Sequence, residues 1–71
     1  MDELTRRAIA AHYRVGNPGQ PGEKSGTRDI EGRCYVVLRD EESKVLAVYR
    51  LTGQGKLRVL RRWPAEIKAE A

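Results

Sequence analysis

The sequence predicts a small α+β protein in which an N-terminal helix packs on a three-stranded antiparallel β-meander. Two observations carry this prediction. The first residues of the chain place apolar side chains at helical spacing, whereas residues 33–63 contain three runs rich in β-branched and aromatic residues, separated by polar or glycine-containing breaks. With 71 residues, the whole chain, 1–71, is expected to form one domain.

The helix is predicted over residues 2–14. Asp2 is suited to cap its first turn, and the run of Gly16, Asn17 and Pro18 ends it. The apolar stripe recurs every three or four residues, as expected for one buried helix face. It consists of Leu4, Ala8, Ala11, His12 and Val15, with Ile9 beside it.

Residues 16–31 are predicted to be a flexible Gly/Pro-rich loop. The segment has no hydrophobic period and only one large apolar residue, Ile30. Within it, residues 22–27 partly match a phosphate-binding loop. The match fails because Glu23 separates Gly22 from Lys24, and because that loop requires a preceding strand and a following helix.

The three strands are predicted at residues 33–39, 44–51 and 56–63. If residues 40–43 form a four-residue loop, Leu38 lies opposite Val45 on the neighbouring strand.

The second hairpin is expected to have a three-residue loop, with Gly55 in the left-handed conformation. This choice places Leu51 near Leu57 and Tyr49 near Val59, so that the two faces of the sheet stay distinct. The tail after Pro64 is a candidate for a short helical turn, anchored by Ile67.

Alternation along the strands predicts one apolar face, which the helix is expected to cover over Val36, Ala47, Tyr49 and Val59. The other face is predicted to be open to solvent, with a basic rim around an aliphatic centre. The rim consists of Arg33, Arg39, Lys44, Arg50, Arg58 and Arg62; the centre consists of Tyr35, Val37, Leu46, Val48 and Leu60.

Composition argues against several classes of function. One cysteine and one histidine supply neither a disulfide nor the usual ligands of a metal, and we expect no cofactor and no catalytic residue. Cys34 is predicted to be a buried, unreactive thiol. The acidic N-terminus and the short apolar runs predict no signal peptide and no membrane span, and hence a cytoplasmic protein.

Charge distribution suggests a binding module that is not an enzyme. The net charge is +4, and residues 32–63 carry eight Lys and Arg against three acidic residues. The first hypothesis is nucleic-acid binding through the basic rim, with Arg33, Arg50 and Arg58 making contacts and Tyr35 stacking on a base. The alternative is a protein partner or a homodimer that covers the aliphatic centre, namely Val37, Leu46, Val48 and Leu60.

Overall fold

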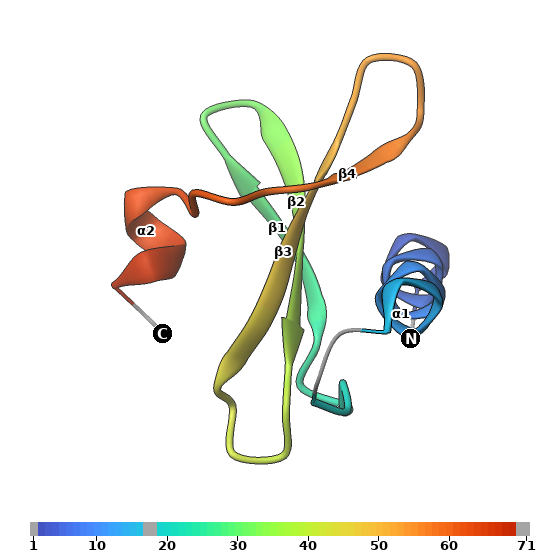
Figure 1. Ribbon diagram of the computed structural model, residues 1–71. Coiled ribbons are helices and arrows are strands. Elements are labelled where there is room, and N and C mark those ends of the chain that lie inside the picture. Colours follow the sequence, from blue (N-terminus) through green and yellow to red (C-terminus); the bar gives the residue numbers. More distant parts are fainter. Residues whose placement is uncertain (1, 17–18, 70–71) are drawn as a thin grey trace.

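The computed structural model describes residues 2–16 and 19–69, which form a four-stranded antiparallel sheet between two helices (Figure 1). The strands lie side by side in chain order, and the helices pack on opposite faces. The α+β class and the N-terminal helix are confirmed, although the sheet has four strands rather than three. The elements are α1 (Glu3–Val15), β1 (Gly26–Ile30), β2 (Arg33–Arg39), β3 (Val45–Leu51), β4 (Leu57–Val59) and α2 (Ala65–Lys68).

The ends of α1 follow the predicted capping residues. The Asp2 carboxylate accepts a hydrogen bond from the backbone N–H of Thr5 at 3.1 Å, and Gly16 closes the helix with a left-handed φ of 74°. Thr5, Ala8 and His12 are fully buried, and their spacing places them on one face. That face packs mainly on β2 and β1. The buried cluster between them consists of Ala8, Val36, Leu38, Ala47 and Tyr49.

Strand β1 corrects the prediction that residues 16–31 form a loop. It pairs antiparallel with β2, and Glu31 and Gly32 join the two strands. Both turn residues have positive φ, 51° and 78°, as a two-residue type I′ hairpin requires. Glutamate occupies the position where Asn or Asp is usual, which is why the sequence did not signal this turn.

The turn between β2 and β3 is tighter than predicted. The Asp40 N–H donates to the Lys44 carbonyl at 3.0 Å, so these two residues are paired and the loop between them has three residues. The Asp40 carboxylate accepts hydrogen bonds from the N–H groups of Glu42 and Lys44, each at 2.9 Å. Ser43 completes the turn with a φ of 68°.

A β-bulge at Leu46 shifts the register further. Arg39 lies opposite Val45, whereas Leu38 lies opposite Ala47, which leaves Leu46 as the extra residue on β3. The predicted pairing of Leu38 with Val45 is therefore wrong. The bulge also changes the facing of two side chains: Val45 packs in the cluster beneath α2, and Leu46 lies against Gly19, on the side of α1.

The hairpin between β3 and β4 has the predicted register. Leu51 pairs with Leu57 and Tyr49 with Val59, and Gly55 has a left-handed φ of 79°. One expectation fails, because Val59 is 54% exposed rather than covered by the helix. The reason is the missed strand: α1 packs mainly over β1 and β2, so on β4 Leu57 still borders the core beneath α1 whereas Val59 is left exposed.

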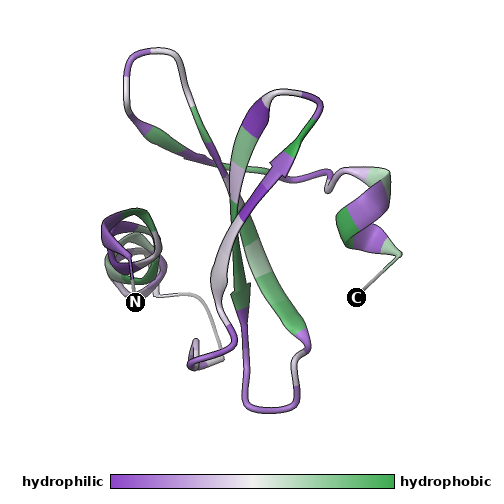
Figure 2. Cartoon of the chain, turned by 180° about the vertical axis from the view of Figure 1, so that it is seen from behind, coloured by the Kyte–Doolittle hydropathy of each residue, from purple (hydrophilic) through white to green (hydrophobic). Residues whose placement is uncertain are grey.

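The second face of the sheet is covered by the C-terminal segment, contrary to the prediction that it is open. Ile67 of α2 is fully buried, and it packs with the buried residues Tyr35, Val37, Val45 and Val48. Trp63, Leu60 and Ile30 border this cluster. Figure 2 shows the hydrophobic part of α2 turned toward the strands. The predicted short C-terminal helical turn is present, and it is structurally important because it closes the second core.

The segment between α1 and β1 is attached to the end of β2. The Gly22 N–H donates to the Arg39 carbonyl at 2.7 Å. The Ser25 hydroxyl accepts from the Arg39 N–H at 2.9 Å and donates to the Arg39 carbonyl at 3.2 Å. These bonds extend the β1–β2 pairing beyond Gly26. The flexibility predicted for residues 16–31 remains a prediction for the part before β1, and residues 17–18 lie outside the described part.

Candidate nucleic-acid interface

A transverse row of three arginines and one tyrosine crosses all four strands. The register places Arg28 of β1 opposite Tyr35 of β2, Tyr35 opposite Arg50 of β3, and Arg50 opposite Arg58 of β4. Because neighbouring strands lie about 4.8 Å apart, the row is about 14 Å long. These four residues are called the arginine row below.

The arginine row lies on the same face of the sheet as α2. Tyr35 and Val48 belong to the core cluster beneath α2, and Arg50 follows Val48 by two residues, so it points to the same side. Arg58 and Arg28 share this face because each lies opposite a member of the row. Arg33, two residues before Tyr35, adds a further exposed guanidinium on this face.

The row lies toward the end of the sheet that carries the β1–β2 and β3–β4 turns, and these two turns point away from each other (Figure 1). The acidic β2–β3 turn, with Asp40, Glu41 and Glu42, is at the opposite end. Arg39 and Lys44 flank that acidic turn, and Glu31 lies in the β1–β2 turn, so each end of the sheet carries charges of both signs.

The seven residues predicted for nucleic-acid binding fall into separate groups. Arg33, Arg50 and Arg58 come together as predicted. Arg39 and Lys44 lie at the acidic turn, and the Arg39 guanidinium donates to the Ser43 carbonyl at 3.0 Å. Arg62 is exposed in the segment that leads from β4 to α2.

Tyr35 is placed in the row, but it is not available for stacking. It is only 7% exposed, and its ring belongs to the core beneath α2. The expectation that it stacks on a base is not compatible with this placement. Its burial follows from the C-terminal segment, whose docking on this face the sequence alone did not indicate.

The aliphatic centre predicted as a protein interface is also covered. Val37 and Val48 are 3% and 0% exposed and pack on Ile67. Leu60 is half-buried against the same cluster, and Leu46 lies on the other side of the sheet because of the bulge. These four residues form no open patch in this structure.

Arg28 is the member of the row that sequence reasoning missed. The sequence predicts a loop over residues 16–31, which gives Arg28 no register in the sheet. A signal for this strand is present in the sequence. Residues 26–30 precede the pair Glu31 and Gly32, and the strand that starts at Arg33 follows directly, which is the spacing of a two-residue hairpin.

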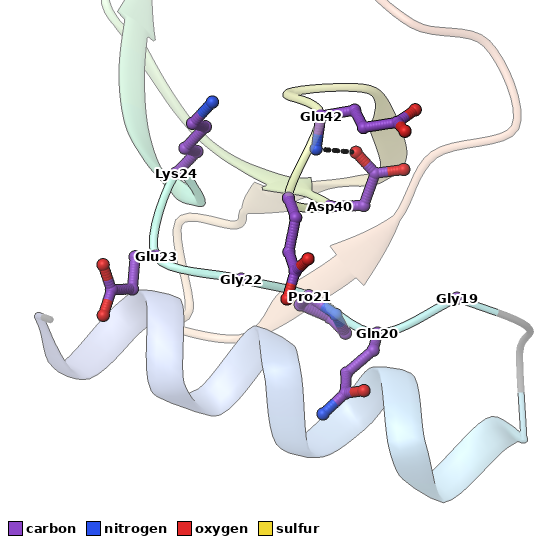
Figure 3. A pocket seen from close by; sticks show the side chains of 9 residues that line it. Gly19, Gln20, Pro21, Gly22, Glu23, Lys24, Asp40 and Glu42 are labelled. Carbon is purple, nitrogen blue, oxygen red and sulfur yellow. Dashed lines mark hydrogen bonds between the residues drawn. The ribbon is translucent and has the colours of Figure 1, made fainter.

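Figure 3 shows an open hollow of about 810 Å³, and no residue of the arginine row lines it. Residues 19–24 of the loop and residues 40–42 of the turn line it. The Asp40 carboxylate already holds two N–H groups of its own turn. Within residues 2–16 and 19–69, no three His, Cys, Asp or Glu side chains are grouped to hold a metal ion.

Cys34 and His12 have different surroundings, Cys34 opposite Asp29 in the sheet and His12 beside the Gly19 carbonyl. Cys34 is half-buried rather than fully buried, and it lies opposite Asp29. Burial raises the pKa of its thiol, and the carboxylates of Asp29 and Asp2 add to the shift, so the thiolate is disfavoured. The His12 Nε2 atom lies 3.2 Å from the Gly19 carbonyl and donates its proton there, because a carbonyl oxygen only accepts.

Comparisons with models of protein families, with curated proteins and with solved structures return no match for this chain. The helices of the described segments include none with the length and apolar character needed to cross a membrane. The fold defines an α+β protein, and one face of its sheet carries Arg28, Arg50 and Arg58 in a single row.

Proposed function

We propose that this protein is a non-enzymatic module that binds nucleic acid through the arginine row and Arg33. The observation that carries the proposal is the direct opposition of Arg50 and Arg58 within a row that also contains Arg28. Like charges directly opposite on neighbouring strands destabilise a sheet. A phosphate bound between them relieves this repulsion, and guanidinium groups match phosphate oxygens in geometry.

The distribution of charge supports the same surface. The segment over residues 32–63 carries a net charge of +5. Its three acidic residues all lie in the β2–β3 turn, at the end of the sheet far from the row. The rest of the chain is close to neutral at −1. The excess positive charge therefore belongs to the segment that contains Arg33, Arg50 and Arg58, which favours the approach of a polyanion to this part of the molecule.

A titration with fluorescent duplex DNA, single-stranded DNA and duplex RNA at several salt concentrations tests the proposal. If the row and Arg33 neutralise three or four phosphates, the slope of log K against log salt is about −3 to −4 on B-DNA, from about −0.9 per phosphate. Arg50→Glu and Arg58→Glu are expected to weaken binding strongly.

Arg6→Glu is the matched control, because Arg6 is exposed on α1 and the charge change is identical. Equal losses in all three variants would reduce the binding to diffuse attraction by a basic protein. No binding at low salt would remove the proposal.

The protein-interaction alternative receives less support from the surface. Its predicted residues are covered or displaced, and the exposed apolar residue on the sheet is Val59 at the edge. A single exposed apolar side chain is ordinary on a protein surface. A cytoplasmic location belongs to the proposal, since nucleic acid must be accessible, and fractionation of cells that express the protein would test it.

A further inference from the structure

The aromatic side chains show which kind of contact the arginine row can make. Proteins that hold single strands stack bases on exposed aromatic rings. The chain has four aromatic residues other than histidine. Tyr35 and Tyr49 are 7% and 3% exposed, and Trp63 is half-buried against the core beneath α2. The exposed ring, Tyr13 at 54%, belongs to α1, which covers the opposite face. Among the described residues, this face therefore has no fully exposed aromatic ring, and Trp63 is the ring on it that keeps partial exposure.

The position of α2 limits how closely the strands can approach base edges. The major groove of B-DNA, about 12 Å wide, admits one helix or a two-stranded ribbon. Here four strands carry a helix on each face, and Val48, next to Arg50 along the same side of β3, is covered by Ile67. α2 thus stands on the same face as the row, and it stops the strands from entering a groove.

The exposed arginines at the end of this face lie beyond the part that α2 covers. Arg33 and Arg58 are exposed and Arg50 is half-buried, so their side chains extend from the rim of the face into solvent. Lys56, Arg61 and Arg62, also exposed, continue the positive charge past β4. A duplex presents one phosphate charge per about 1.7 Å of its axis, which is the densest array that nucleic acid offers to such a row.

From these observations we infer that the arginine row binds the phosphate backbone of duplex nucleic acid without regard to base sequence, and that it prefers a duplex to a single strand of equal length. The inference rests on the proposed function and specifies its ligand. Phosphate contacts position a protein without reading bases. Duplex DNA and duplex RNA share this chemistry, and separate arms of the experiment distinguish them.

The experiment measures binding by fluorescence anisotropy at low salt. The ligands are two short DNA duplexes of unrelated sequence, their separated strands, and an RNA duplex. We expect the two DNA duplexes to bind within about twofold of each other, since backbone contacts are independent of sequence, and each to bind several-fold more tightly than its strands. Arg50→Ala and Arg58→Ala are each expected to make the slope of log K against log salt less negative by about 0.9, because each removes one phosphate contact.

Two variants separate the possible outcomes. Tyr13→Ala should leave every affinity unchanged, because its ring lies on the other face; a loss of single-strand binding would locate stacking at α1 and overturn the inference. Arg6→Glu should change duplex affinity much less than Arg58→Glu, because Arg6 lies on α1. Circular dichroism checks that Arg6→Glu and Arg58→Glu are folded. Tighter binding to single strands, or a tenfold difference between the two duplexes, overturns the inference while the proposed function stands. Absence of binding to every ligand overturns both.

Discussion

Arg50 of β3 and Arg58 of β4 lie directly opposite each other on the face of the sheet that carries α2. Like charges in this position repel, and opposite charges attract. The pair is the centre of the arginine row. It provides a test in which stability and binding change in opposite directions.

Arg58→Glu is therefore expected to stabilise the fold while it weakens nucleic-acid binding. The new Glu faces Arg50, and the gain is about 0.5 kcal/mol because the pair is open to water. Arg58→Gln, which only removes the repulsion, should fall between the parent and Arg58→Glu in urea unfolding at low salt. A gain that persists in high salt would contradict an electrostatic cause.

Ile67→Ala is expected to lower the free energy of unfolding by about 2–5 kcal/mol, because a fully buried side chain is truncated and the core beneath α2 loses its cover. Urea unfolding followed by Trp63 fluorescence measures the change. Glu66→Ala, at an exposed position of the same short helix, is the control and should have little effect. If both variants unfold alike, α2 does not close the second core.

Tyr49→Phe should leave the fold as stable as before or more stable, by about 1 kcal/mol. The Tyr49 hydroxyl is buried without a hydrogen-bond partner, so its removal relieves a desolvation penalty and breaks no bond. A clear loss of stability in thermal unfolding would indicate that the hydroxyl has a partner.

The same residue gives an alkaline pH dependence. Burial raises the pKa of Tyr49 above its ordinary value of 10.0, so the folded state keeps a proton that the unfolded state releases. This contribution to stability is complete below pH 10.0 and is lost as the pH rises toward the raised folded pKa. The loss should be smaller in Tyr49→Phe than in the parent.

Amide hydrogen exchange tests the attachment of the loop before β1. The N–H groups of Gly22 and Arg39 are bonded to the Arg39 carbonyl and the Ser25 hydroxyl, so both should exchange slowly. Glu23 and Lys24, exposed in the turn between them, should exchange fast. Ser25→Ala should speed exchange at Arg39. Uniformly fast exchange from residue 19 to residue 25 would support the predicted flexible loop instead.

Cys34 should react slowly with iodoacetamide near neutral pH, because the pKa of its thiol is raised above 9.0 by burial and by Asp29 and Asp2. Asp29→Asn removes the charge that lies opposite and should speed the reaction. The rate is measured by mass spectrometry on the folded protein. Rapid alkylation of the parent would contradict the raised pKa and indicate an activated thiol.

Local chemistry made part of this structure predictable from the sequence. Asp2 and Gly16 limit α1 because a cap and a left-handed residue act within one turn of the helix. Gly55 determined the β3–β4 register for the same reason, since its left-handed conformation belongs to a three-residue hairpin loop. The opposition of Arg50 and Arg58 follows from that register.

Contacts between distant segments decided the rest. β1 exists through its pairing with β2, and that pairing brings Arg28 into the row and shifts α1 away from Val59. The bulge at Leu46 depends on how Val45 and Ala47 pack on opposite cores. Ile67 buries Tyr35, Val37 and Val48 from about twenty residues or more along the chain, because apolar surface is removed from water wherever the fold brings it together. Alternation assigns side chains to a face of the sheet, but only the tertiary structure decides what covers that face.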